Sequence, residues 1–493
     1  MTLKVVKNDS LTPEEKVLFI SLQGIVNRNK PILYLDIDNY LDYLNEIEFE
    51  YVTLEEALTK YRDYYHGYTL FDFTIGDISI NLSATIASAL DYLSLPTSLG
   101  YLVDKLGLNN FVDLRCLKGD YIDKQEKIFD KYQALLRKDG LIHQVTEKDN
   151  YHISLRDYGI ANRWFCFYTD KGVKAKQFRE KVLNWANRNI PIYGWTTDEI
   201  DFVNDISKHG NYIIPSDWSC NHSALDKFPS VKLKQKEIKY NIIDNKHYLT
   251  IVVSDGDNVQ WLERDFSTTS SFGQRIATDE KYPIGWTIAP SMVNICPTVI
   301  ERLYKMGENN YFISGASGAG YMNPCAFPES LLDDFCKKTS ELMSKCDLNV
   351  VTLLDNLENE DKIHKVINKY AKNDNLIGGI YELDPSKYEG GKGNIYFASN
   401  GKPFASVRVS FWSPDGMKSS VTEEWIQSIA NKINAFKVDK KSKEGYTVLN
   451  VHPWSTTIED LDKLVSLLEN HVQIIKVDDF LRLIKENVEH NRG

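Results

Sequence analysis

The sequence predicts an α/β protein in which an N-terminal α/β region is followed by a C-terminal (β/α) barrel with a TIM-like architecture. Three observations support this fold class. The chain has 493 residues, too many for one ordinary hydrophobic core, so we expect several domains. Short apolar runs alternate with amphipathic helical patterns, as they do in βαβ units. This alternation is most regular after residue 240.

Composition and charge exclude several classes of protein. The chain is 42% hydrophobic and 26% charged, with a net charge of -11 and no long basic run, so nucleic acid and anionic membranes are not expected partners. The 7 cysteines are odd in number and form no CxxC pair, which favours reduced thiols. No apolar run approaches the length of a membrane span, and residues 1–9 lack a signal-peptide core, so we expect a cytoplasmic protein.

A helix start opens the N-terminal region. Thr12, Pro13 and Glu15 combine an N-cap, a proline at the first helical position and the glutamate of a capping box. The apolar run at residues 31–36 then predicts a strand. Further helical patterns and apolar runs follow, so we expect a small α/β domain over residues 1–145.

A second α/β segment is expected over residues 146–235. Residues 163–168 and 190–195 are apolar runs typical of strands, and a helical pattern lies between them. The lysine-rich residues 232–239 show little periodicity, which is typical of a linker.

The barrel is expected over residues 240–493. Its eight candidate strands are Tyr248–Val253, Ile284–Ile288, Tyr311–Ile313, Asn349–Leu354, Leu376–Tyr381, Phe404–Phe411, Tyr446–Val451 and Val472–Val477. Its amphipathic helices are Pro297–Met306, Glu329–Ser344, Glu360–Lys372, Thr422–Phe436 and Thr457–Asn470. The connections at 260–281 and 383–402 show no convincing long helix, so the pattern also fits a seven-stranded or distorted barrel.

Polar residues follow several of the predicted strands. The carboxyl ends of barrel strands are where catalytic groups gather, and the candidates there are Asp255, Asp257, Asp355, Glu382 and His452. Glycoside hydrolysis needs two carboxyl groups, one protonated and one ionised. Our preferred pair joins Asp255 or Asp257 with Glu382, while His452 would hydrogen-bond substrate or tune a carboxylate. The alternative for Asp255 to Asn258 is ordinary turn chemistry.

Aromatic and amide side chains near the same strand ends are candidate sugar contacts. Trp286, Trp412 and Trp454 could each stack on a sugar ring, although a tryptophan is more often part of a core. Asn258 could bind substrate, or it could join Asp255 and Asp257 in holding calcium or magnesium through oxygen ligands. Apart from this cation, the sequence predicts no cofactor and no metal.

A glycine-rich stretch follows the third predicted strand. Residues 311–324 run from an apolar segment into small residues, and the pattern predicts a tight, exposed loop. Gly318, Gly320 and Tyr321 would shape a substrate subsite there. A phosphate-binding loop is disfavoured because its lysine and Ser/Thr are missing, and a glycine-rich turn without a ligand remains the alternative.

Residues 318–324, Gly-Ala-Gly-Tyr-Met-Asn-Pro, resemble the motif that names the GxGYxYP family, described as glycoside hydrolases. Asn323 departs from the motif, which has a second tyrosine there. Residues 22–28, Leu-Gln-Gly-Ile-Val-Asn-Arg, look like the N-terminal signature of the same family. The resemblance therefore covers most of the chain and implies a hydrolase that acts on a carbohydrate.

The barrel is also distantly similar to that of polysaccharide deacetylases. Residues 251–257 and 449–452 look like the first and last motifs of that family. Its metal-binding histidine pair is missing, since only His364 lies between these two segments. Two alternatives to a glycosidase therefore stay open: a non-catalytic carbohydrate-binding protein, and a metal-dependent hydrolase related to the deacetylases.

Overall fold

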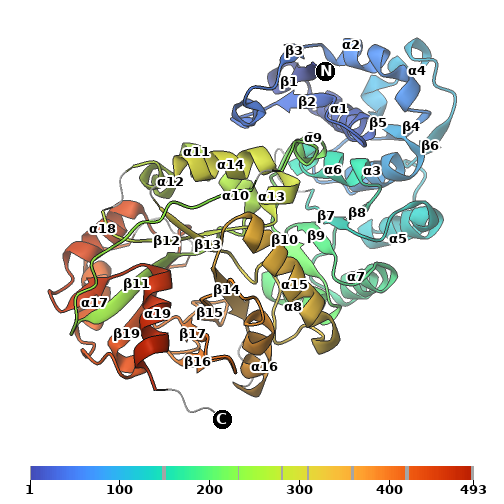
Figure 1. Ribbon diagram of the computed structural model, residues 1–493. Coiled ribbons are helices and arrows are strands. Elements are labelled where there is room, and N and C mark those ends of the chain that lie inside the picture. Colours follow the sequence, from blue (N-terminus) through green and yellow to red (C-terminus); the bar gives the residue numbers. More distant parts are fainter. Residues whose placement is uncertain are drawn as a thin grey trace. The chain divides into compact units, whose positions relative to one another are not determined.

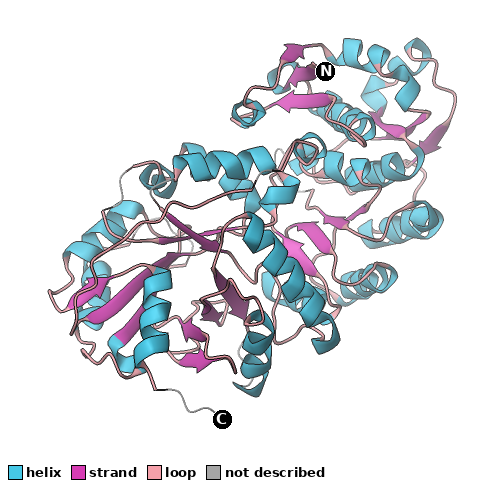
Figure 2. Cartoon of the chain, viewed as in Figure 1, coloured by secondary structure: helices cyan, strands magenta, loops and turns pink. Residues whose placement is uncertain are grey.

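The computed structural model describes residues 2–146, 151–230, 232–278, 281–307, 310–356, 360–416 and 421–489. The chain divides into two compact units: Met1–Ser230 with Asn294–Ile300, and Val231–Val293 with Glu301–Gly493. Both units are built from helices and strands (Figure 2). The domain boundaries drawn from the sequence at residues 145, 235 and 240 stay predictions. No helix in the described ranges is long and apolar enough to cross a membrane.

The first unit consists of parallel sheets and helices. Its strands are β1 Leu3–Lys7, β2 Leu33–Asp36, β3 Phe49–Tyr51, β4 Gly67–Phe71, β5 Tyr92–Pro96, β6 Phe111–Asp113, β7 Leu141–His143, β8 Phe165–Phe167, β9 Pro191–Gly194 and β10 Tyr212–Ile214. Its helices are α1 Pro13–Val26, α2 Leu54–Lys60, α3 Ser79–Leu90, α4 Leu102–Lys105, α5 Tyr121–Tyr132, α6 Arg156–Ala161, α7 Val173–Trp185, α8 Glu199–Lys208 and α9 His222–Leu225. Within the described ranges the strand orders are β2-β1-β3, β5-β4-β6 and β10-β9-β7-β8, all parallel. The α/β class predicted for this region is confirmed.

The predicted start of α1 is also confirmed. The side chain of Thr12 accepts a hydrogen bond from the backbone N–H of Glu15, and the Glu15 carboxylate accepts one from the N–H of Thr12. Pro13 is the first residue of the helix. Both orphan N–H groups are therefore satisfied as the capping-box pattern requires.

The N-terminal signature residues hold this unit together. Asn27 is fully buried, and its Oδ1 accepts hydrogen bonds from the backbone N–H groups of Ile32 and Leu33, both at 2.9 Å. The side-chain amide of Gln23 donates to Oδ1 of Asn221 over 2.7 Å. Asn27 thus satisfies backbone N–H groups at the start of β2, and Gln23 satisfies a buried side chain, so the contacts of both residues are structural.

The second unit contains the remaining strands and helices. The strands are β11 His247–Val253, β12 Gly285–Ile288, β13 Tyr311–Ser314, β14 Val350–Asp355, β15 Gly378–Leu383, β16 Ile395–Phe397, β17 Pro403–Ser406, β18 Val409–Phe411, β19 Tyr446–Val451 and β20 Val472–Ile474. The helices are α10 Val259–Glu263, α11 Asp265–Thr268, α12 Ser271–Ile276, α15 Glu329–Lys345, α16 Glu360–Tyr370, α17 Glu423–Asn434, α18 Ile458–Ser466 and α19 Val477–Asn487. Two more helices, α13 Met292–Ile295 and α14 Pro297–Met306, carry the chain between the units.

One strongly curled, mixed sheet organises the second unit. Its order within the described ranges is β16-β17-β15-β14-β13-β12-β11-β19-β18, and β20 pairs with β11 off this path. Only β16, which pairs with β17, is antiparallel among these strands. Figure 1 shows β11 beside β19, and α19 packs against β11.

A bent segment links two strands that lie far apart in the strand order of the curled sheet. β17 pairs with β15 and β18 pairs with β19, yet only Val407 and Arg408 separate β17 from β18. The backbone N–H of Val407 donates to the carbonyl of Tyr381 in β15, and that of Arg408 donates to the carbonyl of Val448 in β19, each over 3.1 Å. The bend therefore carries the chain from a strand beside β15 to a strand beside β19.

Three details differ from the sequence prediction. The predicted single strand 404–411 is two strands, because it changes partner at the bend. The connection 383–402 contributes β16, whose antiparallel pairing with β17 takes the place of a helical crossover. The predicted strand 472–477 ends at Ile474, since Val477 already begins α19.

Candidate functional site

Three predicted site residues lie at or just after the carboxyl ends of three strands of the curled sheet, of which β11 and β19 are neighbours. Asp255 follows β11, Glu382 lies near the end of β15, and His452 follows β19. Nε2 of His452 lies 4.0 Å from Oδ2 of Asp255. The negative charges of Asp255 and Asp257 act on Glu382. Parallel strands place such residues at one edge of a sheet, and here they form a polar cluster in the second unit.

The turn that carries the two aspartates is tightly built. Asp255 has a left-handed backbone with φ of 67°, and its Oδ2 accepts a hydrogen bond from Oγ of Ser254 at 2.5 Å. The N–H of Gly256 donates to Oγ1 of Thr287 over 2.9 Å. A Cβ atom on Gly256 would lie 1.6 Å from the carbonyl oxygen of Thr287. Glycine is therefore required here for close backbone packing.

Asn258 completes this turn. Its Nδ2 donates to the carbonyl oxygen of Asp255 over 3.1 Å, and its Oδ1 accepts from Nε2 of Gln260 over 3.2 Å. Both ends of the amide are thus engaged within the loop that leads into α10. These contacts correspond to the turn chemistry that was the alternative for this residue.

Glu382 is a buried carboxyl group, only 3% exposed. Burial raises its pKa well above the usual glutamate range, and the charges of Asp255 and Asp257 raise it further. Nδ2 of Asn450 donates to Oε1 of Glu382 over 2.8 Å, which opposes that rise. Burial and the two acidic neighbours thus favour the protonated form of Glu382 over its ionised form.

His452 is held in place from two sides. Its Nδ1 lies 2.9 Å from Oγ of Ser455, which also accepts a hydrogen bond from the N–H of Ser413 over 3.1 Å. Its ring stacks on the indole of Trp412. Burial lowers the pKa of His452, while the charge of Asp255 opposes that effect. The imidazole is thus predominantly neutral at neutral pH.

Asp355 lies apart from the cluster. β14 and β15 pair with Leu354 opposite Glu382 and Asp355 opposite Leu383, so Asp355 and Glu382 point to opposite faces of the sheet. Oδ2 of Asp355 accepts hydrogen bonds from the N–H of Cys325 at 2.8 Å and from the hydroxyl of Tyr381 at 3.2 Å. Burial raises its pKa to about 6. Asp355 therefore anchors the end of the glycine-rich stretch.

The glycine-rich stretch is buried, so the expectation of an exposed loop is wrong. Every residue from Tyr311 to Pro324 is buried. The N–H of Ser317 donates to the carbonyl of Thr352 in β14 over 2.9 Å, and the N–H of Ala319 donates to Oγ1 of Thr339 in α15 over 3.0 Å. Pairing with these neighbours fixes the loop inside the unit.

The glycines of this loop allow close packing. Gly318 has φ of 100°, and a Cβ there would lie 2.3 Å from Cγ2 of Thr339. A Cβ on Gly315 would lie 3.0 Å from the backbone nitrogen of Asp257. Gly320 is buried, and Tyr321 is 3% exposed. The loop thus supports the turn at Asp257, and a direct contact of Gly318, Gly320 or Tyr321 with substrate stays a prediction.

The three candidate tryptophans have different surroundings. Trp286 is 2% exposed, and its Nε1 donates to Oδ1 of Asn310 over 2.8 Å, so it belongs to the core and is left out of the site. Trp412 is half-buried beside His452. Trp454 is half-buried and its ring centroid lies 5.0 Å from that of Trp261. Only Trp412 and Trp454 therefore retain exposed aromatic surface.

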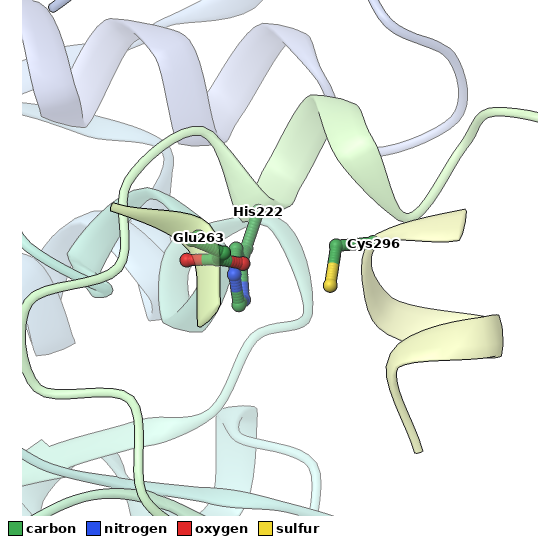
Figure 3. Close-up of side chains that lie close together, drawn as sticks. All are labelled: His222, Glu263 and Cys296. Atoms are coloured by element: carbon green, nitrogen blue, oxygen red, sulfur yellow. The ribbon is translucent and has the colours of Figure 1, made fainter. Parts of the chain in front are cut away.

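Two side chains that could bind a metal lie close together outside the polar cluster. In the first unit, a ring nitrogen of His222 and Sγ of Cys296 lie within 4.8 Å of each other (Figure 3). Glu263, also drawn there, belongs to α10 of the second unit. Two ligands alone do not make a structural zinc site, which takes four. Among the described side chains, Asp255 and Asp257 join no cluster of three possible ligands, so a divalent cation there stays a prediction.

Sequence reasoning missed the polar partners that organise the cluster. Asn450 lies within an apolar strand, and Ser455 follows a strand end; neither position carries a motif. An asparagine inside an apolar β-run is nevertheless unusual, because burying an unpaired amide is costly. That composition was the one available signal for Asn450.

Comparison with known proteins gives a consistent result. Residues 245–485 match the family model "GxGYxYP putative glycoside hydrolase C-terminal domain", 141–226 match "GxGYxYP third domain", and 2–67 match "GxGYxYP_N 1st domain". The fold is similar to the crystal structure of a putative hydrolase from Bacteroides thetaiotaomicron VPI-5482, with a TM-score of 0.85 and 25% sequence identity. That match covers 99% of this chain and 95% of the other. No curated protein sequence matches the chain.

Proposed function

The chain belongs to the GxGYxYP putative glycoside hydrolase family, and from this premise we propose that it hydrolyses a glycosidic bond with Glu382 as general acid. The observation that carries the proposal is the environment of Glu382. Burial and two neighbouring aspartates raise its pKa, which favours the protonated form of this carboxyl group. Glycosidases need such a proton on one carboxyl group while a second stays ionised.

The curled sheet supplies the scaffold of the proposed site. Because Val407 and Arg408 bond to β15 and β19 respectively, we propose that β11 to β15, the β17–β18 segment and β19 act as a seven-stranded (β/α) barrel. The carboxyl ends of β11, β15 and β19 then surround one opening. This arrangement would place Asp255, Glu382 and His452 around a single sugar.

Asp255 and Asp257 are the proposed ionised partners. Both follow β11, and both act electrostatically on Glu382. One of them would serve as nucleophile, or as the base that activates water, once Glu382 has protonated the leaving oxygen. The separation of the two reacting carboxyl groups decides between a retaining and an inverting outcome.

His452 and Trp412 form the proposed sugar-facing wall. If the Ser455 hydroxyl donates to Nδ1 of His452, the proton of the neutral imidazole sits on Nε2, which faces Asp255. Such a ring can orient Asp255 without adding a positive charge. The exposed parts of Trp412 and Trp454 can contact the apolar face of a sugar.

The direct test is hydrolysis. Release of reducing ends from a panel of oligosaccharides and polysaccharides should occur with the wild-type protein and fall about 10²–10⁴-fold in Glu382→Gln and Asp255→Asn. Glu486→Gln, an exposed position in α19, is the matched control and should keep wild-type turnover. Glycan binding that survives both carboxylate changes, without hydrolysis in the wild type, would favour the non-catalytic alternative.

A further inference from the structure

Asn450 is a buried polar residue in a strand of mostly apolar residues. It lies in β19, opposite Val252 of β11 and Ser410 of β18, and it is fully buried. A carboxamide in such a place lowers stability unless its donor and acceptor groups are used. The position therefore calls for a specific partner.

That partner is Glu382, which accepts a hydrogen bond from the N–H side of the amide and leaves the amide oxygen unused. Nδ2 of Asn450 donates to Oε1 of Glu382 over 2.8 Å. Oδ1 of Asn450 is buried and has no hydrogen-bond partner in the described part of the chain. A carboxylate needs the N–H donor, whereas a carboxylic acid also offers an O–H that needs an acceptor. The unused oxygen belongs to the same amide.

We propose that Asn450 is a positioning residue that pairs with both protonation states of Glu382. Nδ2 donates to the ionised carboxylate, and after a half-turn of the amide Oδ1 accepts from the protonated carboxyl group. Because it assigns a role to the acid of the glycosidase reaction, this inference rests on the proposed function. The hydrogen bond itself can be tested without any substrate.

The exchange fits the proton balance of glycoside hydrolysis. The proton of Glu382 goes to the glycosidic oxygen as the bond to the sugar carbon breaks. Glu382 is then an anion beside two aspartates, and the Asn450 N–H stabilises it. The water that adds to the sugar carbon later supplies the proton that restores the acid form. Asn450 gains and loses no atom in this cycle.

The charged groups near Glu382 disfavour its ionised form, whereas Asn450 stabilises that form. From the loop after β11, Asp255 and Asp257 act on Glu382, and both disfavour its ionised form. On β14, the residue opposite is the apolar Leu354. Beyond Asn450 on β19, His452 lies close to Asp255. The amide is thus the group that opposes the aspartates.

Infrared difference spectroscopy of the full chain tests the proposal. The carbonyl band of protonated Glu382 is assigned by its loss in Glu382→Gln and then followed with pH. In Asn450→Leu, which has nearly the same shape, the midpoint of this band should rise by about one pH unit because the carboxylate loses its donor. The band should also move to higher wavenumber because the acid O–H loses its acceptor.

Two further variants keep the test decisive. Asn450→Asp should also raise the midpoint, since a second carboxyl group then faces Glu382. Thr250→Val removes a buried hydroxyl with no described partner from β11 and should leave band and midpoint unchanged. With a substrate, kcat of Asn450→Leu should fall about tenfold with little change in KM, and the alkaline limb of the pH profile should move to higher pH.

The outcomes separate this inference from the proposed function. An unchanged midpoint and band position in Asn450→Leu would overturn the positioning role, even in an active hydrolase. A shifted midpoint in a protein that hydrolyses no glycan would support the pairing and count against the glycosidase reaction.

Discussion

The imidazole of His452 lies flat on the indole of Trp412, with ring centroids 3.4 Å apart and ring planes 9° apart. This contact links the residue that follows β19 to the residue that follows β18. The N–H of Ser413 donates to Oγ of Ser455, which is within hydrogen-bond distance of His452 Nδ1, so a second contact ties the same two strand ends. His452 therefore has one fixed orientation, with Nε2 towards Asp255.

Replacing Trp412 should release His452. In Trp412→Ala the imidazole gains solvent, so its pKa should rise from its lowered value towards the ordinary 6.5. A proton NMR titration measures this pKa, and the His452→Gln spectrum identifies the resonance. Trp425→Ala, at a half-buried position in α17, is the control and should leave the titration unchanged. A His452 pKa that stays low in Trp412→Ala would show that the stacked indole does not shield the imidazole from water.

Gly256 should tolerate no side chain. A methyl carbon there would lie 1.6 Å from the carbonyl oxygen of Thr287. The backbone can move away from such a contact only at a high cost in free energy. Gly256→Ala should therefore lower the free energy of unfolding by about 3 kcal/mol and move Asp255 and Asp257, with loss of turnover. Thermal denaturation and an activity assay measure both effects. Gly100→Ala, where the nearest atom would lie at 3.2 Å, should be close to neutral.

Asp355 should make stability depend on pH without serving the reaction. Its folded pKa of about 6 lies above the usual value of 3.8, so the stability it contributes is full below 3.8 and is lost as pH rises through 6. Relative to Asp355→Asn, the wild-type protein should lose about 3 kcal/mol of unfolding free energy across that window. Urea denaturation at several pH values measures the difference.

A measurement of turnover distinguishes a structural role of Asp355 from a catalytic one. Because its side chain points to the opposite face from Glu382, Asp355→Asn should keep turnover within a few-fold of the wild type. A large loss of turnover at unchanged stability would return Asp355 to the catalytic candidates.

Regular elements could be predicted from the sequence because their patterns are local. The strand at Tyr446–Val451 and the helix at Pro297–Met306 have the bounds that the apolar periodicity predicts. The helix start at Thr12 follows from a capping box within four residues. The search for polar residues directly after predicted strands likewise pointed to Asp255, Glu382 and His452.

Features that depend on three-dimensional pairing could not be predicted. The bend at Val407–Arg408 arises because one apolar run pairs with two different strands. The face on which Asp355 lies depends on the β14–β15 register. The pairing of Asn450 with Glu382 joins residues 68 apart in the chain. No sequence spacing encodes any of these relationships.

The leaving-group dependence of Glu382→Gln tests the central claim most directly. Two substrates with the same sugar are compared, one with an alkyl or sugar leaving group and one with a nitrophenyl group that departs without protonation. If Glu382 is the general acid, kcat/KM of Glu382→Gln should fall about 10²–10⁴-fold with the first and far less with the second, while Asp255→Asn impairs both. An equal loss of kcat/KM with both substrates, or no loss with either, would contradict the assignment of Glu382 as the acid.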